Sequence, residues 1–266
     1  MKPILEVLIC TIDEGINKLE NSLLSPIDSI KYLISWQQSG TTAIPIPASL
    51  EQREDVRILI HQGKGLAANR NHALEAATGD YLLLSDDDAR YTEDYFRHLV
   101  DAFSAYPDDD LFTLQMVDEM GHFLKNYPTA TFRYPHCPKG FYVSSLEIAF
   151  RRSDRLPRFD TRFGIGSAYL ACGEEEVFLH EALKNGLHAR YIPLTVVETP
   201  RSTTGSRFNT DVCVRRSKGA VLFVLHGYWG ALLRCLRYTF RIPLKSRYTF
   251  FKDLYDGIKY IKNGER

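Results

Sequence analysis

The sequence predicts an α/β fold with a mostly parallel central sheet, flanked by helices and followed by a helical C-terminal appendage. Short apolar runs alternate with helical patterns through the first half of the chain, an arrangement typical of parallel sheets. One run, residues 81–84, ends in three adjacent carboxylates, and open α/β sheets place their ligands at the carboxyl ends of strands. With 266 residues and 44% apolar content, the chain can bury one sizeable core.

Six apolar runs, each bounded by turn residues or polar clusters, are expected to form strands of this sheet. In chain order they are residues 4–10, 29–36, 56–61, 81–84, 111–117 and 187–197. Two further strands, in antiparallel orientation, are expected at residues 123–133 and 140–150. Helices are expected at residues 16–24, 65–79, 94–105 and 173–186, between helix start and stop signals.

Three adjacent carboxylates, Asp86, Asp87 and Asp88, follow the strand at 81–84. Adjacent carboxylates repel one another, and a divalent cation relieves that repulsion. Oxygen ligands select a hard ion such as Mg²⁺ or Mn²⁺, which also bridges substrate phosphates, so a nucleoside-diphosphate substrate is favoured. The alternative is a solvated turn or the cap of the next helix. A second acidic run, Asp108–Asp110, lies between a helix and a strand and is expected to be a turn.

Residues 65–80 read Gly-Leu-Ala-Ala-Asn-Arg-Asn-His-Ala-Leu-Glu-Ala-Ala-Thr-Gly-Asp and lead directly into this strand and its acidic end. The order of glycine, small residues, Arg-Asn, small-residue helix, Gly-Asp, strand and Asp-x-Asp resembles bacterial family 2 nucleotide-sugar glycosyltransferases of the GT-A type. The resemblance covers residues 1–90 best and recurs further along the chain. It implies a GT-A fold with a Rossmann-like, mostly parallel sheet, and an enzyme that transfers a sugar.

The resemblance also implies a nucleotide site. Thr11, after the first strand, is expected near the base, and Arg70 near the diphosphate or ribose. Asp86 and Asp87 are expected to contact the nucleotide, and Asp88 and Asp86 to hold the Mg²⁺ or Mn²⁺ ion. There is an alternative for each. The loop after the first strand could serve only to favour the start of the following helix, and Arg70 could be a solvated arginine on a helix surface.

The end of the second strand departs from the family pattern. Many members carry Asp residues there, whereas this chain reads Ser35-Trp36-Gln37. Trp36 is expected to pack in the core rather than stack on a base. The identity of the base therefore stays open.

A second constellation begins at the loop Gly164-Ile165-Gly166 and continues into a helix that opens with Glu174, Glu175 and Glu176. In the resembling family a Gly-Glu-Asp here carries the catalytic base. Glu175 stands at the Asp position and is the expected base, with Glu174 as the neighbouring candidate. The alternative is that these carboxylates only complement the dipole of the helix.

The polar loop after residues 187–197 supplies three more candidates. Relatives often place a metal-ligating His where Glu198 stands, and a carboxylate serves a hard cation equally well. Arg201 and Arg207 are expected to clamp the diphosphate, with free surface arginines as the alternative.

Composition narrows the partners and the compartment. Lys and Arg together number 33, as do Asp and Glu, so no polycationic surface points to nucleic acid. Five cysteines without CxxC spacing favour free thiols in a reducing cytosol. Glu6 interrupts the N-terminal apolar run, which argues against an export signal. A cytoplasmic protein is expected, at or near the inner face of the cell membrane.

The C-terminal part differs from the rest. Residues 220–233 are apolar but are shorter than the roughly 20 residues that span a bilayer. Basic and aromatic residues surround them over 215–247, which favours contact with a membrane surface over packing on the domain or on a second subunit. We expect a glycosyltransferase domain at 1–210, with a nucleotide part at 1–118 and an acceptor part at 119–210, and a helical segment at 211–266.

The expected function is an inverting, metal-dependent transfer of a sugar from a nucleoside-diphosphate sugar, most simply a UDP-sugar, to a hydroxyl of a glycan or lipid-linked acceptor in cell-surface polysaccharide synthesis. Two alternatives stay open: a nucleotidyltransferase, and a non-catalytic protein that binds nucleotide sugars or glycans. The sugar, the linkage and the oligomeric state do not follow from motifs.

Overall fold

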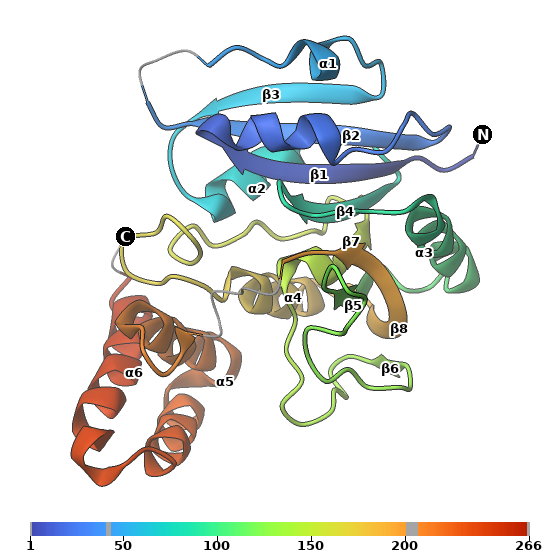
Figure 1. Ribbon diagram of the computed structural model, residues 1–266. Helices are drawn as coiled ribbons and strands as arrows, with labels where there is room; N and C mark the ends of the chain where they lie inside the picture. The colour runs from blue at the N-terminus through green and yellow to red at the C-terminus, as the bar shows by residue number, and fades with distance from the viewer. Residues whose placement is uncertain (1, 41–43, 201–206, 265–266) are drawn as a thin grey trace. The chain divides into compact units, whose positions relative to one another are not determined.

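The structure, a computed structural model, describes residues 2–40, 44–200 and 207–264. The chain divides into two compact units (Figure 1). The first unit holds the sheet and is made of Met1–Lys64, Asn69–Arg158 and Glu181–Arg201. The second unit holds the C-terminal helices and is made of Gly65–Ala68, Phe159–His180 and Ser202–Arg266.

The first unit is built on an eight-stranded sheet of order β3-β2-β1-β4-β7-β5-β8-β6 among the described residues (Figure 1). The strands are β1 Leu5–Ile12, β2 Ile30–Gln38, β3 Val56–Gln62, β4 Tyr81–Asp86, β5 Leu111–Val117, β6 Phe132–Arg133, β7 Ile148–Arg151 and β8 Ala189–Glu198. The pairs β3-β2, β2-β1, β1-β4 and β5-β8 are parallel, whereas β7 and β6 pair antiparallel to their neighbours. The predicted mostly parallel α/β fold is confirmed.

The central strands are apolar along almost their whole length because both of their faces are buried. In β4 every residue from Tyr81 to Ser85 is buried, and in β1 every residue from Leu5 to Thr11. A buried carboxylate in β1, Glu6, accepts hydrogen bonds from the backbone N–H groups of Thr78 and Gly79 at 2.6 and 2.8 Å. These bonds fix the turn that delivers β4 to the sheet.

The helices before β8 mostly follow the predicted pattern. They are η1 Asp13–Asn21, α1 Ala48–Glu51, α2 Leu66–Ala76, α3 Glu93–Ala105 and α4 Glu174–Lys184. The helix expected at 16–24 is instead the 3₁₀ helix η1, which packs on β1 and β2 through Ile16 and Leu19. α3 begins at its cap Thr92, whose side chain accepts from Tyr95 N at 3.2 Å.

The strands expected at 123–133 and 140–150 are mostly absent from the described residues, which form only β6 and β7 there. A buried side chain explains the difference. The Glu147 carboxylate accepts from Lys125 Nζ and from Ser144 N, each at 2.6 Å, and from the Tyr127 hydroxyl. These bonds hold two loops and the short helix η2 (Ser145–Glu147) in place of a regular hairpin.

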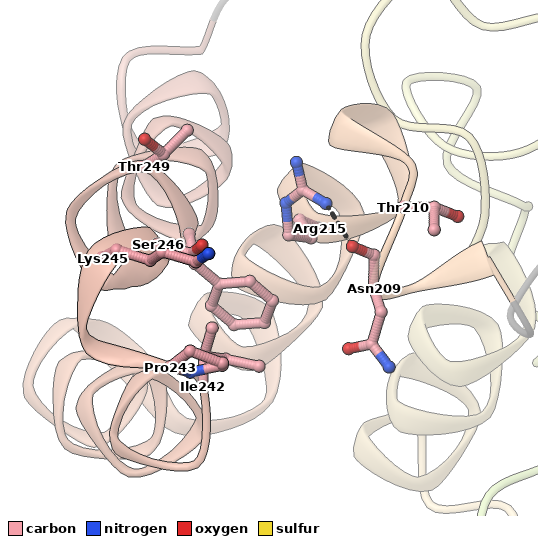
Figure 2. Close-up of a pocket in the computed structure, with 9 residues that line it drawn as sticks. Asn209, Thr210, Arg215, Ile242, Pro243, Lys245, Ser246 and Thr249 are labelled. Atoms are coloured by element: carbon pink, nitrogen blue, oxygen red, sulfur yellow. Dashed lines mark hydrogen bonds between the residues drawn. The ribbon is translucent and has the colours of Figure 1, made fainter.

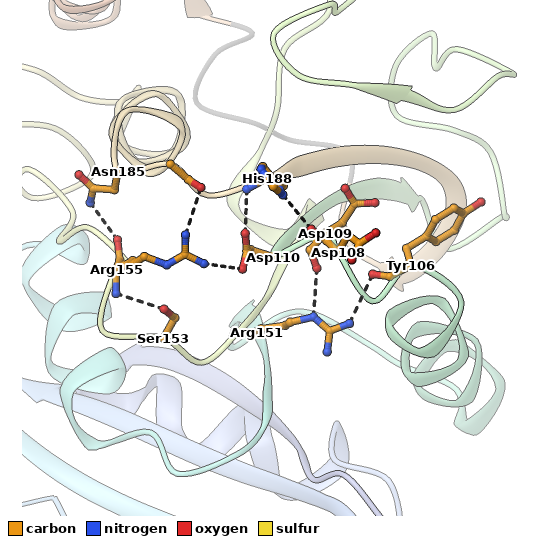
Figure 3. Close-up of polar contacts among 10 residues, drawn as sticks. Tyr106, Asp108, Asp109, Asp110, Arg151, Ser153, Arg155, Asn185 and His188 are labelled. Atoms are coloured by element: carbon orange, nitrogen blue, oxygen red, sulfur yellow. Dashed lines mark hydrogen bonds and ion pairs between the residues drawn. The ribbon is translucent and has the colours of Figure 1, made fainter.

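The second acidic run, Asp108–Asp110, is structural, as predicted (Figure 3). Asp110 accepts from the backbone N–H of His188 at 2.8 Å and from the guanidinium of Arg155 at 3.0 Å. Arg151 donates through Nε to the carbonyl of the middle residue at 3.0 Å. The run therefore ties the start of β5 to β7 and to the segment before β8.

The second unit contains α5 (Val212–Phe240), η4 (Leu244–Ser246) and α6 (Arg247–Lys262), with α5 and α6 packed side by side (Figure 1). The backbones touch at two glycines: a Cβ on Gly219 would clash with the carbonyl of Leu254, and one on Gly257 with the carbonyl of Arg216. Leu222, Ala231, Cys235, Phe250, Leu254 and Ile258 form the core between the two helices.

α5 is interrupted at Gly227, which has φ 66° and ψ −179°, values outside the helical region. Among the described residues, α5 is the one helix long and apolar enough to cross a membrane by length and composition, although 33% of its most apolar stretch is buried within the protein. The break at Gly227 leaves two shorter helical segments, each below the roughly 20 residues that span a bilayer.

Candidate active site

The acidic triplet lies at the carboxyl end of β4, next to the end of β1, in the first unit. Cys10 of β1 pairs with Asp86 of β4 in parallel register, which brings Thr11 beside the triplet. Thr11 Oγ1 donates to Asp87 Oδ2 at 2.6 Å, and Lys18 Nζ donates to Asp87 Oδ1 at 2.7 Å. Both oxygens of Asp87 therefore contact protein groups.

Arg70 is buried, unlike the solvated arginine of the plainer expectation, and only 2% of its surface is exposed. It donates to Asp86 Oδ1 at 3.2 Å and to Ser145 Oγ at 2.7 Å. A buried guanidinium that contacts a partly exposed carboxylate keeps positive charge beside the triplet. This arrangement suits an anionic ligand as well as the carboxylate itself.

The carboxyl group of Asp88 has a raised pKa. Partial burial raises the pKa of the Asp88 carboxyl, and the neighbouring charges of Asp86 and Asp87 raise this pKa further, while Lys18 acts in the opposite direction. A carboxylate with a raised pKa in a cluster of like charge is stabilised by a cation. Asp88 is also the exposed member of the triplet, so an ion can approach it from solvent.

The outer carboxylates of the triplet, Asp86 and Asp88, stay candidates for a divalent ion. No group of three or more His, Cys, Asp or Glu side chains in residues 2–40, 44–200 and 207–264 could hold a metal alone. Mg²⁺, however, is usually bound by one or two carboxylates together with substrate phosphates and water. Asp86 and Asp88 supply such a pair, because Asp87 is engaged by Thr11 and Lys18.

Glu198 is the last residue of β8, and its backbone lies close to the triplet. Its N–H and carbonyl pair with the carbonyl and N–H of Arg90, two residues beyond Asp88, at 3.0 and 2.8 Å. The structure thus brings Glu198 near the metal-ligand candidates, but its carboxylate is not part of a metal group with them. Its role as a ligand stays a prediction.

The second constellation lies in the second unit. Glu174 is buried, and Gly164, with φ +98°, passes so close that a Cβ there would lie 3.0 Å from the Glu174 carboxyl carbon. The glycine in the predicted loop is thus required by the room that Glu174 occupies and by its own backbone conformation. Glu175 is half-buried. The pKa of the nearby Cys172 thiol is raised to about 12, first by burial of the thiol and then by the negative charge of Glu175. The catalytic roles of Glu174 and Glu175 stay predictions.

Three residues near the triplet were not predicted from the sequence. Lys18 and Ser145 carry no motif signal, because their contacts depend on the packing of η1 and η2 on the sheet. Asn69 did carry one, since it stands beside Arg70 in the quoted motif. Its buried side-chain amide donates to the Thr11 carbonyl at 3.1 Å and so holds the end of β1.

Trp36 packs in the core, as expected from the sequence. It is fully buried, and its Nε1 donates to the Asp13 carbonyl at 2.8 Å. Of the two loop arginines, Arg201 lies outside the described residues, and Arg207 pairs with Asp211 at 3.4 Å.

The second unit also contains a pocket of about 590 Å³ (Figure 2). It is lined by Asn209, Thr210, Arg215, Ile242, Pro243, Lys245, Ser246, Thr249 and Phe250. Arg215 donates through Nε to the Asp253 carboxylate at 2.8 Å and through a terminal nitrogen to the Asn209 carbonyl at 3.1 Å. None of the predicted site residues lines this pocket.

Residues 39–168 match the family model of glycosyl transferase family 2. This stretch contains α2, β4 and the acidic triplet, the elements on which the resemblance was based. The resemblance is confirmed over these residues, slightly under half of the chain, and the protein is a glycosyltransferase with a GT-A type fold.

Solved structures of TarS from S. aureus are similar to this chain. The TarS 1–349 crystal structure matches with a TM-score of 0.60 and 14% identity, covering 98% of this chain and 82% of that one. TarS 1–349 in complex with UDP matches with the same score and identity over 97% of this chain and 81% of that one, and its complex with UDP-GlcNAc does so over 96% and 81%. At this identity the likeness shows the fold alone. No curated protein matches the chain.

Proposed function

We propose that this glycosyltransferase moves a sugar from a UDP-sugar to a hydroxyl group of a glycan or lipid-linked acceptor, with inversion and with the help of a divalent cation, in cell-surface polysaccharide synthesis. The observation that carries the proposal is the pair of outer carboxylates, Asp86 and Asp88, at the carboxyl end of β4 beside the buried Arg70. The use of a UDP-sugar is further supported by the similar TarS structures with UDP and UDP-GlcNAc.

Asp86 and Asp88 are the residues that would hold Mg²⁺ or Mn²⁺. Such an ion, when bound, stabilises the negative charge that develops on a departing diphosphate, a contribution of several kcal/mol. Arg70 keeps Asp86 in place and adds positive charge next to it. Asn69 and Asp87 fix the end of β1 and so hold the Thr11 loop, the segment proposed to contact the nucleotide.

Glu175 is the proposed general base. Its carboxylate would take the proton from the acceptor hydroxyl as that oxygen attacks the anomeric carbon from the face opposite the diphosphate. Base catalysis of this kind is typically worth about 10²–10⁴-fold in rate. Direct attack inverts the configuration, so no covalent sugar intermediate on the protein is needed.

The test is a panel of nucleotide sugars, each measured for thermal stabilisation of the protein with Mn²⁺ and with EDTA. A ligand at a hundred times its dissociation constant adds about 2.7 kcal/mol to stability, which gives a clear upward shift in Tm. The donor that stabilises only with Mn²⁺ is then incubated with hydroxyl acceptors, and the products are identified by mass spectrometry.

The proposal expects release of UDP and a glycosylated acceptor of inverted configuration. Release of pyrophosphate would instead identify a nucleotidyltransferase. Donor binding without hydrolysis or transfer across the acceptor panel would identify a binding protein that lacks catalysis. Equal stabilisation in Mn²⁺ and EDTA would contradict the metal-dependent part alone.

A further inference from the structure

The second half of α5 exposes a continuous apolar face. Trp229, Leu233, Leu236 and Phe240 recur at intervals of four, three and four residues, the spacing that places side chains on one side of a helix. With Leu244 and Tyr248 beyond the helix end they form what we call the apolar face, whose members are each between 41% and 80% exposed. Exposed aromatic and leucine side chains in a row mark an interaction site.

The opposite side of the same segment is covered. Ala231, Cys235 and Thr239 are buried, and the first two belong to the core shared with α6. The helix is thus held in the protein by one side and presents the apolar face outward. The apolar face is therefore exposed to solvent and is not part of a hydrophobic core.

A basic stripe runs beside the apolar face. Arg234, Arg237 and Arg241 follow at helical spacing, and Lys245 continues the series past the end of α5. No ion pair of Arg237, Arg241 or Lys245 is formed within residues 207–264, and all three are exposed. No Asp or Glu stands anywhere between Asp211 and Asp253, so this part of a chain with zero net charge is purely cationic.

We propose that the apolar face and the basic stripe dock the protein on the surface of a membrane that contains anionic phospholipids. An apolar row of Trp, Leu and Phe beside a row of Arg and Lys is the pattern of helices that lie in the membrane interface. Cationic side chains are attracted to acidic headgroups, whereas a protein partner with an apolar groove would not need an uninterrupted positive stripe. Docking brings the enzyme to lipid-linked acceptors, and only that consequence depends on the proposed function.

The break at Gly227 suits docking better than spanning. It separates the first segment of α5, which packs on α6 at Gly219, from the segment that carries the apolar face. Arg234 and Arg237 lie within the second segment, where a bilayer core would disfavour them. At an interface, the same side chains reach the headgroups while Leu233 and Phe240 enter the acyl boundary.

The test uses the full chain and vesicles of phosphatidylcholine with or without phosphatidylglycerol, in a co-sedimentation assay. We expect binding to the anionic vesicles that weakens as salt is raised. The double variant Leu233→Ser/Phe240→Ser should lower the partition coefficient at least about tenfold, because two large apolar side chains are lost. Arg237→Gln/Arg241→Gln should lower it about thirtyfold on anionic vesicles.

Matched controls come from the exposed surface of the first unit: Met120→Ser for the apolar change and Lys31→Gln/Lys139→Gln for the charge change. These should bind vesicles as the wild type does. Absence of wild-type binding, or equal loss in variants and controls, would overturn the proposal. So would a wild-type dimer in sedimentation velocity that the apolar variant converts to monomer without any vesicle binding, because the face would then join two copies. Docking uses none of the candidate catalytic carboxylates, so sugar transfer to a soluble acceptor should be unchanged in every variant.

Discussion

Thr11 Oγ1 donates a 2.6 Å hydrogen bond to the carboxylate of Asp87, although the two residues lie 76 positions apart in the chain. Lys18 occupies the second oxygen of the same carboxylate. The middle member of the triplet thus joins the ends of β1 and β4, whereas Asp86 contacts Arg70 and Asp88 is exposed; these two outer members are the proposed cation ligands. The three aspartates, alike in sequence, are expected to differ in function.

Single substitutions should show that Asp88 serves sugar transfer, whereas Asp87 serves the stability of the fold. Asp88→Asn should reduce transfer at least about a thousandfold, the equivalent of several kcal/mol of lost charge stabilisation, and should abolish Mn²⁺-dependent binding of UDP in calorimetry. It should also raise Tm without metal, since a carboxylate with a raised pKa is disfavoured in its charged form at neutral pH. Asp87→Asn should lower the free energy of unfolding by about 1–3 kcal/mol through weaker bonds to Thr11 and Lys18. Identical behaviour of the two variants would refute the division of roles.

Glu175→Gln tests the general base. Transfer should fall by about 10²–10⁴-fold while the affinity for the donor is unchanged, because the amide keeps the size of the side chain but cannot accept the proton. Glu174→Gln serves as the comparison. If the Glu174 variant loses transfer and the Glu175 variant keeps it, the base is the buried neighbour.

Arg70→Gln tests the buried guanidinium. It removes charge-assisted hydrogen bonds to Asp86 and Ser145, so the free energy of unfolding in urea should fall by about 2–3 kcal/mol. Ser145→Ala removes only one of these bonds and should cost about 0.5–1.5 kcal/mol. A stability of the Arg70 variant equal to that of the wild type would mean that this contact is not formed in solution.

His72 gives a pH prediction in the first unit. Its ring stacks on His61 at 4.7 Å, and its Nδ1 lies 2.8 Å from Ser35 Oγ. Burial and, to a lesser degree, His61 lower the pKa of His72 in the folded protein. A lowered histidine pKa contributes stability above the unfolded pKa of about 6.5, and this stability is lost as pH falls through the folded value. Between about pH 7.5 and 5.5 the wild type should therefore lose more stability to urea than His72→Gln does, while the exposed His98→Gln should follow the wild type.

The main strands of the sheet could be predicted from the sequence, because buried parallel strands appear as apolar runs. The acidic end of β4 could be predicted as well, because the triplet directly follows such a run. The sequence was insufficient for residues 119–147. There the Glu147 carboxylate, with Lys125 and Tyr127, replaces strand pairing, and a single buried side chain leaves no periodic signal. Lys18 and Ser145 were missed for the same reason, since contacts between distant elements depend on packing.

The sequence predicted that the C-terminal part is helical, but it did not predict how the helices pair. Composition indicated helices with basic and aromatic flanks. The pairing of α5 with α6 depends on two glycines, Gly219 and Gly257, whose missing side chains admit the opposite backbone. A glycine within an apolar run does not reveal its partner, and the helical segment expected at 211–266 was not divided into α5 and α6.

The antiparallel strand β7 has a practical consequence for anyone who trims the protein. It borders β4, yet it is drawn from residues 148–151, far beyond the nucleotide part expected at 1–118. A fragment that stops at 118 would lose β7 and so uncover one edge of β4 at Tyr81–Leu83, while β1 still covers the other edge. Such an uncovered edge invites strand pairing between molecules, and the fragment should precipitate rather than serve as a minimal nucleotide-binding module.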